Sequence, residues 1–239
     1  MLYYPWISKH TTSGCSSAGR ANACQALGHR FEPGHPLQLS IMEITEFKLQ
    51  NPGILKTQVP ADLFEQIKKD LTWYRGEDYN ENLVGHIEDE REFIITDKIQ
   101  FFLEELAEHY HQRFNIKDFR VVSHLAWVNL QKKHEFNPCH LHDSALSWVL
   151  WVKIPYRLED EDNLPNTIKT RYSLNSRFQF FYNQLDGKQA VQTLDIDQSW
   201  QGTILLFPST LRHTVYPFYT SDQARISIAG NIYATFTDQ

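Results

Sequence analysis

Two histidines separated by one residue are the first feature of the sequence that indicates chemistry. His140 and His142 lie in the segment CHLHDS, residues 139–144. In an extended strand the side chains of residues i and i+2 share a face, so both imidazoles can reach one metal ion. A third histidine, His213, lies in FPSTLRHTVYPF just after a Pro-Ser turn. Because histidine binds iron, copper, nickel and zinc, and a β-sandwich can bring distant strands together at one end, the three residues predict a metal site.

Asp143 offers an alternative ligand to the same site. The common non-haem iron centre uses two histidines and one carboxylate and leaves three coordination positions open. Strand alternation places Asp143 on the face opposite His140 and His142, so a regular strand favours the three-histidine set. If the strand bends there, Asp143 can replace His142. The sequence favours three histidines and leaves this alternative open.

A second group of residues has the chemistry of a carboxylate receptor. Arg225 and Ser227 lie in ARISIAGN and share one face of a predicted strand that follows the strand carrying His213. A guanidinium binds a carboxylate through two hydrogen bonds, and a hydroxyl adds one more. Upstream, Asn129 in LAWVNL would be a buried amide that needs a partner, for which the carboxylate of a cosubstrate is a candidate. The alternative for Arg225 is a surface salt bridge on an edge strand.

The elements that must position these residues fall into two halves of the chain. Apolar residues at helical spacing predict helices near residues 61–71 and 96–114. From residue 120 onward, short β-branched and aromatic segments separated by turn residues predict strands near 120–130, 147–155, 177–185, 202–208, 213–218 and 225–236. The fold class is therefore mostly β with flanking helices (α+β), with an antiparallel sandwich or barrel. The acidic segment 158–167 is expected to be a solvated loop.

Composition limits the partners and the location of the protein. With 29 acidic and 23 basic residues, the formal charge of −6 gives no support for a nucleic-acid partner. No apolar run approaches the roughly 20 residues that cross a bilayer, so we expect no membrane span. Three cysteines, Cys15, Cys24 and Cys139, favour neither a disulfide framework nor a cysteine zinc site, and the cytoplasm is the expected location. Residues 1–41 lack sustained apolar periodicity and are expected to be a flexible leader or a mis-called extension of a domain spanning 42–239.

The combined motifs resemble the iron(II)- and 2-oxoglutarate-dependent oxygenase superfamily, in particular the small oxygenases of phages and marine bacteria. The chain has HLHDSALSWVLWV, FPSTLRHTVYP and RISIAGN where those proteins have H-x-H-x(4)-S, F-P-x-x-x-x-H-x-V-x-P and R-I-S-x-x-x-N. The resemblance implies a double-stranded β-helix (jelly-roll or cupin-like) fold. It further implies that the protein is located in the cytoplasm of a bacterium or of a phage-infected host. It also implies Fe(II), 2-oxoglutarate and O2 as cofactors and hydroxylation of a C–H bond, with a peptide or small molecule as substrate.

The resemblance also assigns roles to individual residues. It implies that His140, His142 and His213 hold Fe(II), that Arg225 and Ser227 hold the distal carboxylate of 2-oxoglutarate, and that Asn129 supports the cosubstrate. The chain departs from the common H-x-D/E form, so its site is less anionic by one charge. Trp127, Trp148 and Trp151 are expected either to wall the pocket or, more often at such positions, to be plain core.

Two alternatives are a cupin-like metal-binding protein that does not use 2-oxoglutarate and a non-catalytic jelly-roll module of phage or bacterial origin. A hydrolase is disfavoured because the sequence has neither an H-E-x-x-H helix nor a G-x-S-x-G elbow.

Overall fold

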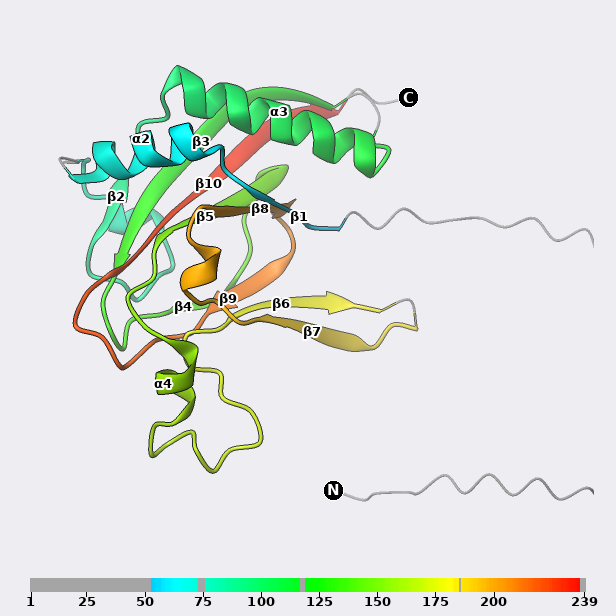
Figure 1. Ribbon diagram of the computed structural model, residues 1–239. Coiled ribbons are helices and arrows are strands. Elements are labelled where there is room, and N and C mark those ends of the chain that lie inside the picture. Colours follow the sequence, from blue (N-terminus) through cyan, green and yellow to red (C-terminus); the bar gives the residue numbers. More distant parts are fainter. Residues whose placement is uncertain (1–52, 73–75, 117–118, 185, 237–239) are drawn as a thin grey trace, which may run out of the picture. The chain divides into compact units, whose positions relative to one another are not determined.

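The computed structural model describes residues 53–72, 76–116, 119–184 and 186–236 (Figure 1). The chain divides into two units, Met1–Lys48 and Leu49–Gln239, and every described residue belongs to the second. The predicted leader 1–41 and its boundary at residue 42 lie outside the described residues, so the division of the chain stays a prediction.

Two antiparallel sheets form the domain. The major sheet has the strand order β1-β8-β5-β10-β3-β2, and the minor sheet has the order β4-β9-β6-β7. The strands of the major sheet are β1 (Leu55–Gln58), β2 (Glu90–Glu92), β3 (Phe119–Gln131), β5 (Leu146–Lys153), β8 (Thr203–Pro208) and β10 (Arg225–Phe236). Those of the minor sheet are β4 (Asn137–His140), β6 (Phe178–Asn183), β7 (Gln189–Leu194) and β9 (Arg212–Val215).

The central strand β5 shows why the domain has two layers of core. Its sequence LSWVLWVK is apolar on both faces, and all residues except the last are buried. Leu150 belongs to the cluster beneath the helices, whereas Val149 and Trp151 belong to the cluster that includes Phe178 of the minor sheet. A strand that is buried on both faces loses the polar alternation typical of an exposed sheet. The two sheets therefore pack face to face with β5 between two apolar layers.

Two helices cover the outer face of the major sheet (Figure 1). Helices α2 (Ala61–Thr72) and α3 (Asp97–Arg113) agree with the predicted helices within one residue at most ends. The buried face of α3 carries Leu103, Leu106 and Tyr110, at the three- and four-residue spacing of an amphipathic helix. The Tyr110 hydroxyl donates to the Gly53 carbonyl at 2.9 Å, which ties the helix to the start of the described chain. Short 3-10 turns occur at Asn80–Asn82 and Gln198–Trp200.

The acidic segment at 158–167 differs from its prediction. It begins with a short helix, α4 (Leu158–Asp162), and Glu161 is fully buried. The Glu161 carboxylate accepts hydrogen bonds from the backbone nitrogens of Tyr219 and Thr220 and from the Thr220 hydroxyl. The solvated-loop prediction was therefore wrong for Glu161, because its partners lie almost 60 residues away and leave no local signal. Through these hydrogen bonds the Glu161 carboxylate stabilises the loop between β9 and β10.

The predicted fold class is confirmed: the domain is β-rich, with two antiparallel sheets in a jelly-roll arrangement and helices on one face. The predicted strands appear as β3, β5, β6, β8, β9 and β10, whereas β1, β2, β4 and β7 were not predicted. Within the described ranges, no helix is both long and apolar enough to cross a membrane.

Candidate metal centre and cosubstrate cavity

The three predicted histidines lie together. His140 at the end of β4 and His213 in β9 are direct cross-strand partners, and their ring centroids are 4.2 Å apart. The His142 centroid lies 5.0 Å from that of His140 and 5.3 Å from that of His213. One ligand atom from each ring lies within 4.8 Å of the others. These three histidines form the candidate metal-binding cluster of the described residues.

The local backbone differs from the one that the sequence predicted. The regular strand β4 ends at His140, so the extended strand expected through His142 is interrupted. The His142 backbone nitrogen donates instead to the Ser209 carbonyl at 2.9 Å. Ser209 is itself fully buried, and its hydroxyl lies 2.9 Å from that of Ser147. A serine network at the start of β5, not strand alternation, therefore fixes the backbone at His142.

Asp143 does not join the histidines. Its side chain is exposed, and it is not part of the group of candidate ligands. The chain bends after His140, as the alternative prediction required, but the bend keeps His142 with the other two rings. The geometry favours the three-histidine set over the set with Asp143.

Backbone carbonyls fix the orientation of two of the imidazoles. Nδ1 of His140 lies 2.7 Å from the Pro138 carbonyl, and Nδ1 of His213 lies 2.9 Å from the Leu211 carbonyl. In each pair Nδ1 must carry the hydrogen, because a carbonyl only accepts. Nε2 then holds the lone pair that a metal needs, an arrangement typical of metal-binding histidines.

Burial keeps the three rings uncharged. It lowers the pKa of His213 to about 3 and that of His142 to about 4, in each case with a further contribution from His140. Burial also lowers the pKa of His140. A histidine must be neutral to bind a metal, so the rings are ready for an ion at neutral pH without releasing a proton. The donor set, three neutral imidazoles, fits a divalent ion such as iron.

Aromatic side chains enclose the histidine cluster. The Phe178 ring stacks on His213 with centroids 5.6 Å apart and an interplanar angle of 7°, and Phe207 meets the same ring edge-on at 5.1 Å. The ring centroids of Trp127 and His142 are 5.7 Å apart. These contacts restrict the rings and exclude water from one side of the site.

A cavity of about 290 Å³ joins the histidines to the predicted carboxylate receptor. The residues that line it include all six residues that the sequence singled out as ligands and the alternative ligand Asp143. Trp127, Trp148 and Trp151 also line it, while Trp148 and Trp151 belong to the core clusters as well. The two interpretations of the tryptophans are therefore both correct, since they are core residues that form the cavity wall.

Arg225 is buried in this cavity and has neutral partners. Its side chain is 2% exposed and lies on β10 in the interior of the major sheet, which excludes the surface salt bridge on an edge strand. Its Nε donates to Gln131 Oε1 at 3.1 Å and its Nη1 to the Tyr156 hydroxyl at 2.8 Å. Its Nη2 also donates to Gln131 Oε1, and the remaining hydrogen bonds go to the carbonyls of Ser176 and Tyr216. None of the ion pairs of the described residues involves Arg225, so its buried positive charge lacks a counter-ion. A buried cation of this kind fits an anionic ligand.

Ser227 and Asn129 are cross-strand partners two residues along their strands from Arg225 and Gln131, and the Asn129 amide donates to the Ser227 hydroxyl at 3.3 Å. Sequence reasoning missed Tyr156 and Gln131, although Gln131 shares the strand face of Asn129 and pairs directly with Arg225. It also missed Glu90, which is 1% exposed and lines the same cavity.

The sequence of residues 125–231 matches a family model described as "Putative 2OG-Fe(II) oxygenase". This range contains every residue that was predicted to bind the metal or the cosubstrate. A comparison with curated proteins gives no significant match.

Solved structures that resemble the fold include several oxygenases. A prolyl-4-hydroxylase from Pseudomonas putida is 14% identical with a TM-score of 0.48, covering 76% of this chain and 92% of that one. A prolyl hydroxylase from Trichoplax adhaerens, in complex with a hypoxia inducible factor oxygen degradation domain peptide fragment, is 12% identical with a TM-score of 0.49, covering 76% and 84%. HygX from Streptomyces hygroscopicus, with nickel and 2-oxoglutarate bound, is 10% identical with a TM-score of 0.40, covering 75% and 82%. At these identities the roles of residues in those proteins do not transfer to this chain. Through residues 125–231, the chain matches the 2OG-Fe(II) oxygenase family.

Proposed function

We propose that the protein is an Fe(II)- and 2-oxoglutarate-dependent dioxygenase that hydroxylates a C–H bond of a separate substrate. The observation that carries the proposal is one cavity with three neutral imidazoles at one side and a buried, uncompensated guanidinium at another. A dicarboxylate could bind the metal held by the imidazoles with one end and the guanidinium with the other. The family match over residues 125–231 supports the same activity.

Each residue has a role that follows from its surroundings. His140, His142 and His213 would hold the iron, with His140 and His213 presenting Nε2 because their Nδ1 atoms donate to backbone carbonyls. Arg225 binds the distal carboxylate of 2-oxoglutarate and is held in place by its hydrogen bond to the Tyr156 hydroxyl at 2.8 Å, and Ser227, two residues further along β10 on the same face, adds a hydroxyl. Asn129 supports the cosubstrate through its amide nitrogen, which already faces Ser227.

When bound, iron and 2-oxoglutarate supply the oxidising power, with O2 consumed and succinate and CO2 released. The chain itself orients the reactants and excludes water. Phe178, Phe207 and Trp127 enclose the imidazoles, so charge on the bound keto acid is screened little by solvent. The substrate is a small molecule or a peptide, of which a part enters the 290 Å³ cavity.

Succinate formation tests the proposal. Wild-type protein with Fe(II), O2 and 2-oxoglutarate should release succinate, whereas His213→Ala should lose the activity and Arg225→Ala should need far more 2-oxoglutarate. Equal activity in wild type and His213→Ala would remove the metal assignment.

A cupin-like metal-binding protein is the alternative function. It is distinguished by a binding measurement, because 2-oxoglutarate should raise the melting temperature of the metal-loaded wild-type protein. Stabilisation by the metal alone, with no further effect of 2-oxoglutarate, would favour the cupin-like alternative. Failure to bind one Fe(II) per chain under anaerobic conditions would favour a non-catalytic jelly-roll module.

A further inference from the structure

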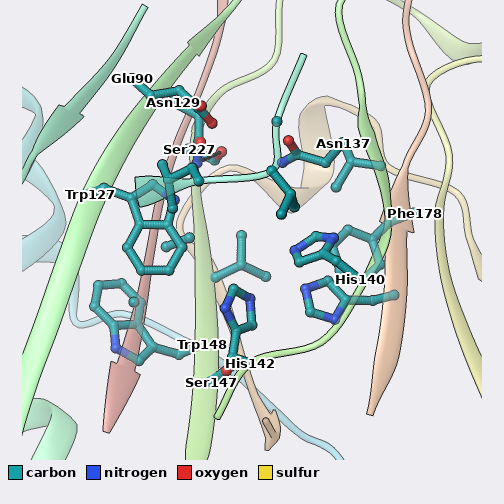
Figure 2. A pocket seen from close by; sticks show the side chains of 18 of the residues that line it. Glu90, Trp127, Asn129, Asn137, His140, His142, Ser147, Trp148, Phe178 and Ser227 are labelled. Carbon is teal, nitrogen blue, oxygen red and sulfur yellow. Dashed lines mark hydrogen bonds between the residues drawn. The ribbon is translucent and has the colours of Figure 1, made fainter. Parts of the chain in front are cut away.

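A row of polar side chains crosses the inner face of the major sheet within the cavity. Glu90 of β2 pairs with Asn129 of β3, which pairs with Ser227 of β10. Figure 2 shows these three side chains grouped together, apart from His140 and His142. Asn137 of β4 extends towards the same space from the minor sheet.

Three oxygens of this group are buried and have no hydrogen-bond partner among the residues that the structure describes. They are Glu90 Oε2, Asn129 Oδ1 and Asn137 Oδ1. The Asn129 amide nitrogen donates to Ser227, so its oxygen is left as an acceptor. A buried acceptor without a donor destabilises the folded protein, so three in one place indicate a missing donor.

Position 85 has no room for a side chain that could supply this donor. A Cβ atom there would lie 2.4 Å from Asn137 Oδ1 and 2.7 Å from Glu90 Oε1. The two side chains therefore meet at this glycine, and any larger residue would displace them. The absence of a side chain at Gly85 lets the side-chain oxygens of Asn137 and Glu90 lie close together.

Within the described part of the chain, the Glu90 carboxyl also forms no ion pair. Burial is the main cause that raises its pKa to about 7, and the negative charges of Glu135 and Asp78 also raise it. Its contribution to folding is therefore unfavourable at neutral pH. A buried acidic group without a cation is typical of a binding site.

The exposed residues that line the cavity are two apolar ones, Val84 and Leu141, and two polar ones, Asn82 and Asp143. Val84 and Leu141 both line it and are 52% and 46% exposed, and Trp127 and Trp148 form the adjoining wall. The apolar part of this lining offers hydrocarbon and aromatic surfaces to an entering ligand. This combination suits an apolar stem that ends in a group rich in N–H donors.

We propose that Glu90, Asn129 and Asn137 bind the primary ammonium at the end of an aliphatic stem, as in a lysyl side chain, of the substrate that is oxidised in this cavity. The substrate role rests on the function proposed above. An ammonium has three N–H donors and no acceptor, which matches three unpartnered oxygens and one negative charge. A neutral analogue leaves the carboxylate without a counter-charge and is bound more weakly.

The competing explanation needs no ligand: Glu90 keeps a proton and donates it to the Asn129 oxygen. Binding of Nα-acetyl-lysine methylamide to the metal-free full chain separates the two explanations. Calorimetry should give saturable binding that is about ten-fold or more tighter than that of Nα-acetyl-norleucine methylamide, which lacks the ammonium. Glu90→Gln should reduce the affinity for the lysine derivative to that for the norleucine derivative. Glu92→Gln, the same change at an exposed position of the same strand, should leave it unchanged.

Equal affinity for the two probes, or unchanged lysine affinity in Glu90→Gln, would overturn the proposal in favour of the shared proton. Retained circular dichroism of Glu90→Gln shows that lost binding does not reflect unfolding. The oxygenase proposal fails by a different observation, since it requires 2-oxoglutarate to stabilise the Fe(II)-loaded wild type. Each proposal can therefore fail alone.

Discussion

The two faces of strand β10 differ in composition and in what they contribute. On the outer face, Ile228 and Ile232 are at most 1% exposed and pack beneath the helices in one apolar cluster. On the inner face, Arg225, Ser227 and Asn231 place polar groups in or near the cavity. The outer face stabilises the fold through apolar burial, whereas the inner face retains a charge and acceptors that folding alone does not favour. Adjacent residues on one strand therefore allow stability and binding to be separated.

Ile228→Ala should give the largest change in stability. Removing a buried isoleucine side chain typically costs about 2–5 kcal/mol of unfolding free energy through lost burial and a residual cavity. The affinity of the remaining folded protein for 2-oxoglutarate should stay near that of wild type. Urea unfolding and calorimetric titration check the two parts, and a matched loss of affinity would show that the two faces are not separable.

Glu90→Gln should stabilise the protein at neutral and alkaline pH. The folded carboxyl has a pKa of about 7 against an ordinary 4.5, so the wild type loses stability as the pH rises through this interval. The difference between variant and wild type should be near zero below pH 4.5 and reach about 3 kcal/mol above pH 7. Unfolding curves measured between pH 4 and 8 test this, and a pH-independent difference would mean that Glu90 is not the buried acid described here.

Ser227→Ala provides the inner-face counterpart of Ile228→Ala. Its hydroxyl receives one hydrogen bond, from Asn129 at 3.3 Å, so the unfolding free energy should change by less than about 1 kcal/mol. Loss of a hydrogen bond to a carboxylate should weaken 2-oxoglutarate binding by roughly ten-fold. Calorimetry on the metal-loaded protein measures this, and unchanged affinity would remove Ser227 from the cosubstrate site.

Asp143→Asn should have the smallest effect. Because the side chain is exposed and separate from the three rings, metal affinity should change by less than about two-fold through long-range charge alone. His142→Asn is the matched variant and should abolish tight metal binding. If a metal-competition assay showed a larger loss of metal affinity in Asp143→Asn than in His142→Asn, Asp143 would be the third ligand.

The sequence predicted the residues that occur in short motifs and missed those placed by long-range pairing. The three histidines and Arg225 were recognisable because strand periodicity and motif spacing fix which residues share a face. Glu90 was not, since the strand that carries it is three residues long and gains its position by pairing with β3, nearly forty residues later.

Two further misses have the same physical origin. Tyr156 reaches Arg225 from a loop after β5 across 69 residues, and Glu161 is buried by backbone donors of a distant segment. Neither contact has a periodic pattern. The backbone at His142 was also missed, because a hydrogen bond to the Ser209 carbonyl replaces the regular strand there.

Anaerobic Fe(II) titration of wild type, His213→Ala and Arg225→Ala tests the central claim most directly. The account predicts one Fe(II) per chain in wild type and in Arg225→Ala, no tight Fe(II) in His213→Ala, and 2-oxoglutarate binding that needs both the iron and Arg225. Stoichiometric iron in His213→Ala, or undiminished 2-oxoglutarate binding in Arg225→Ala, would contradict it.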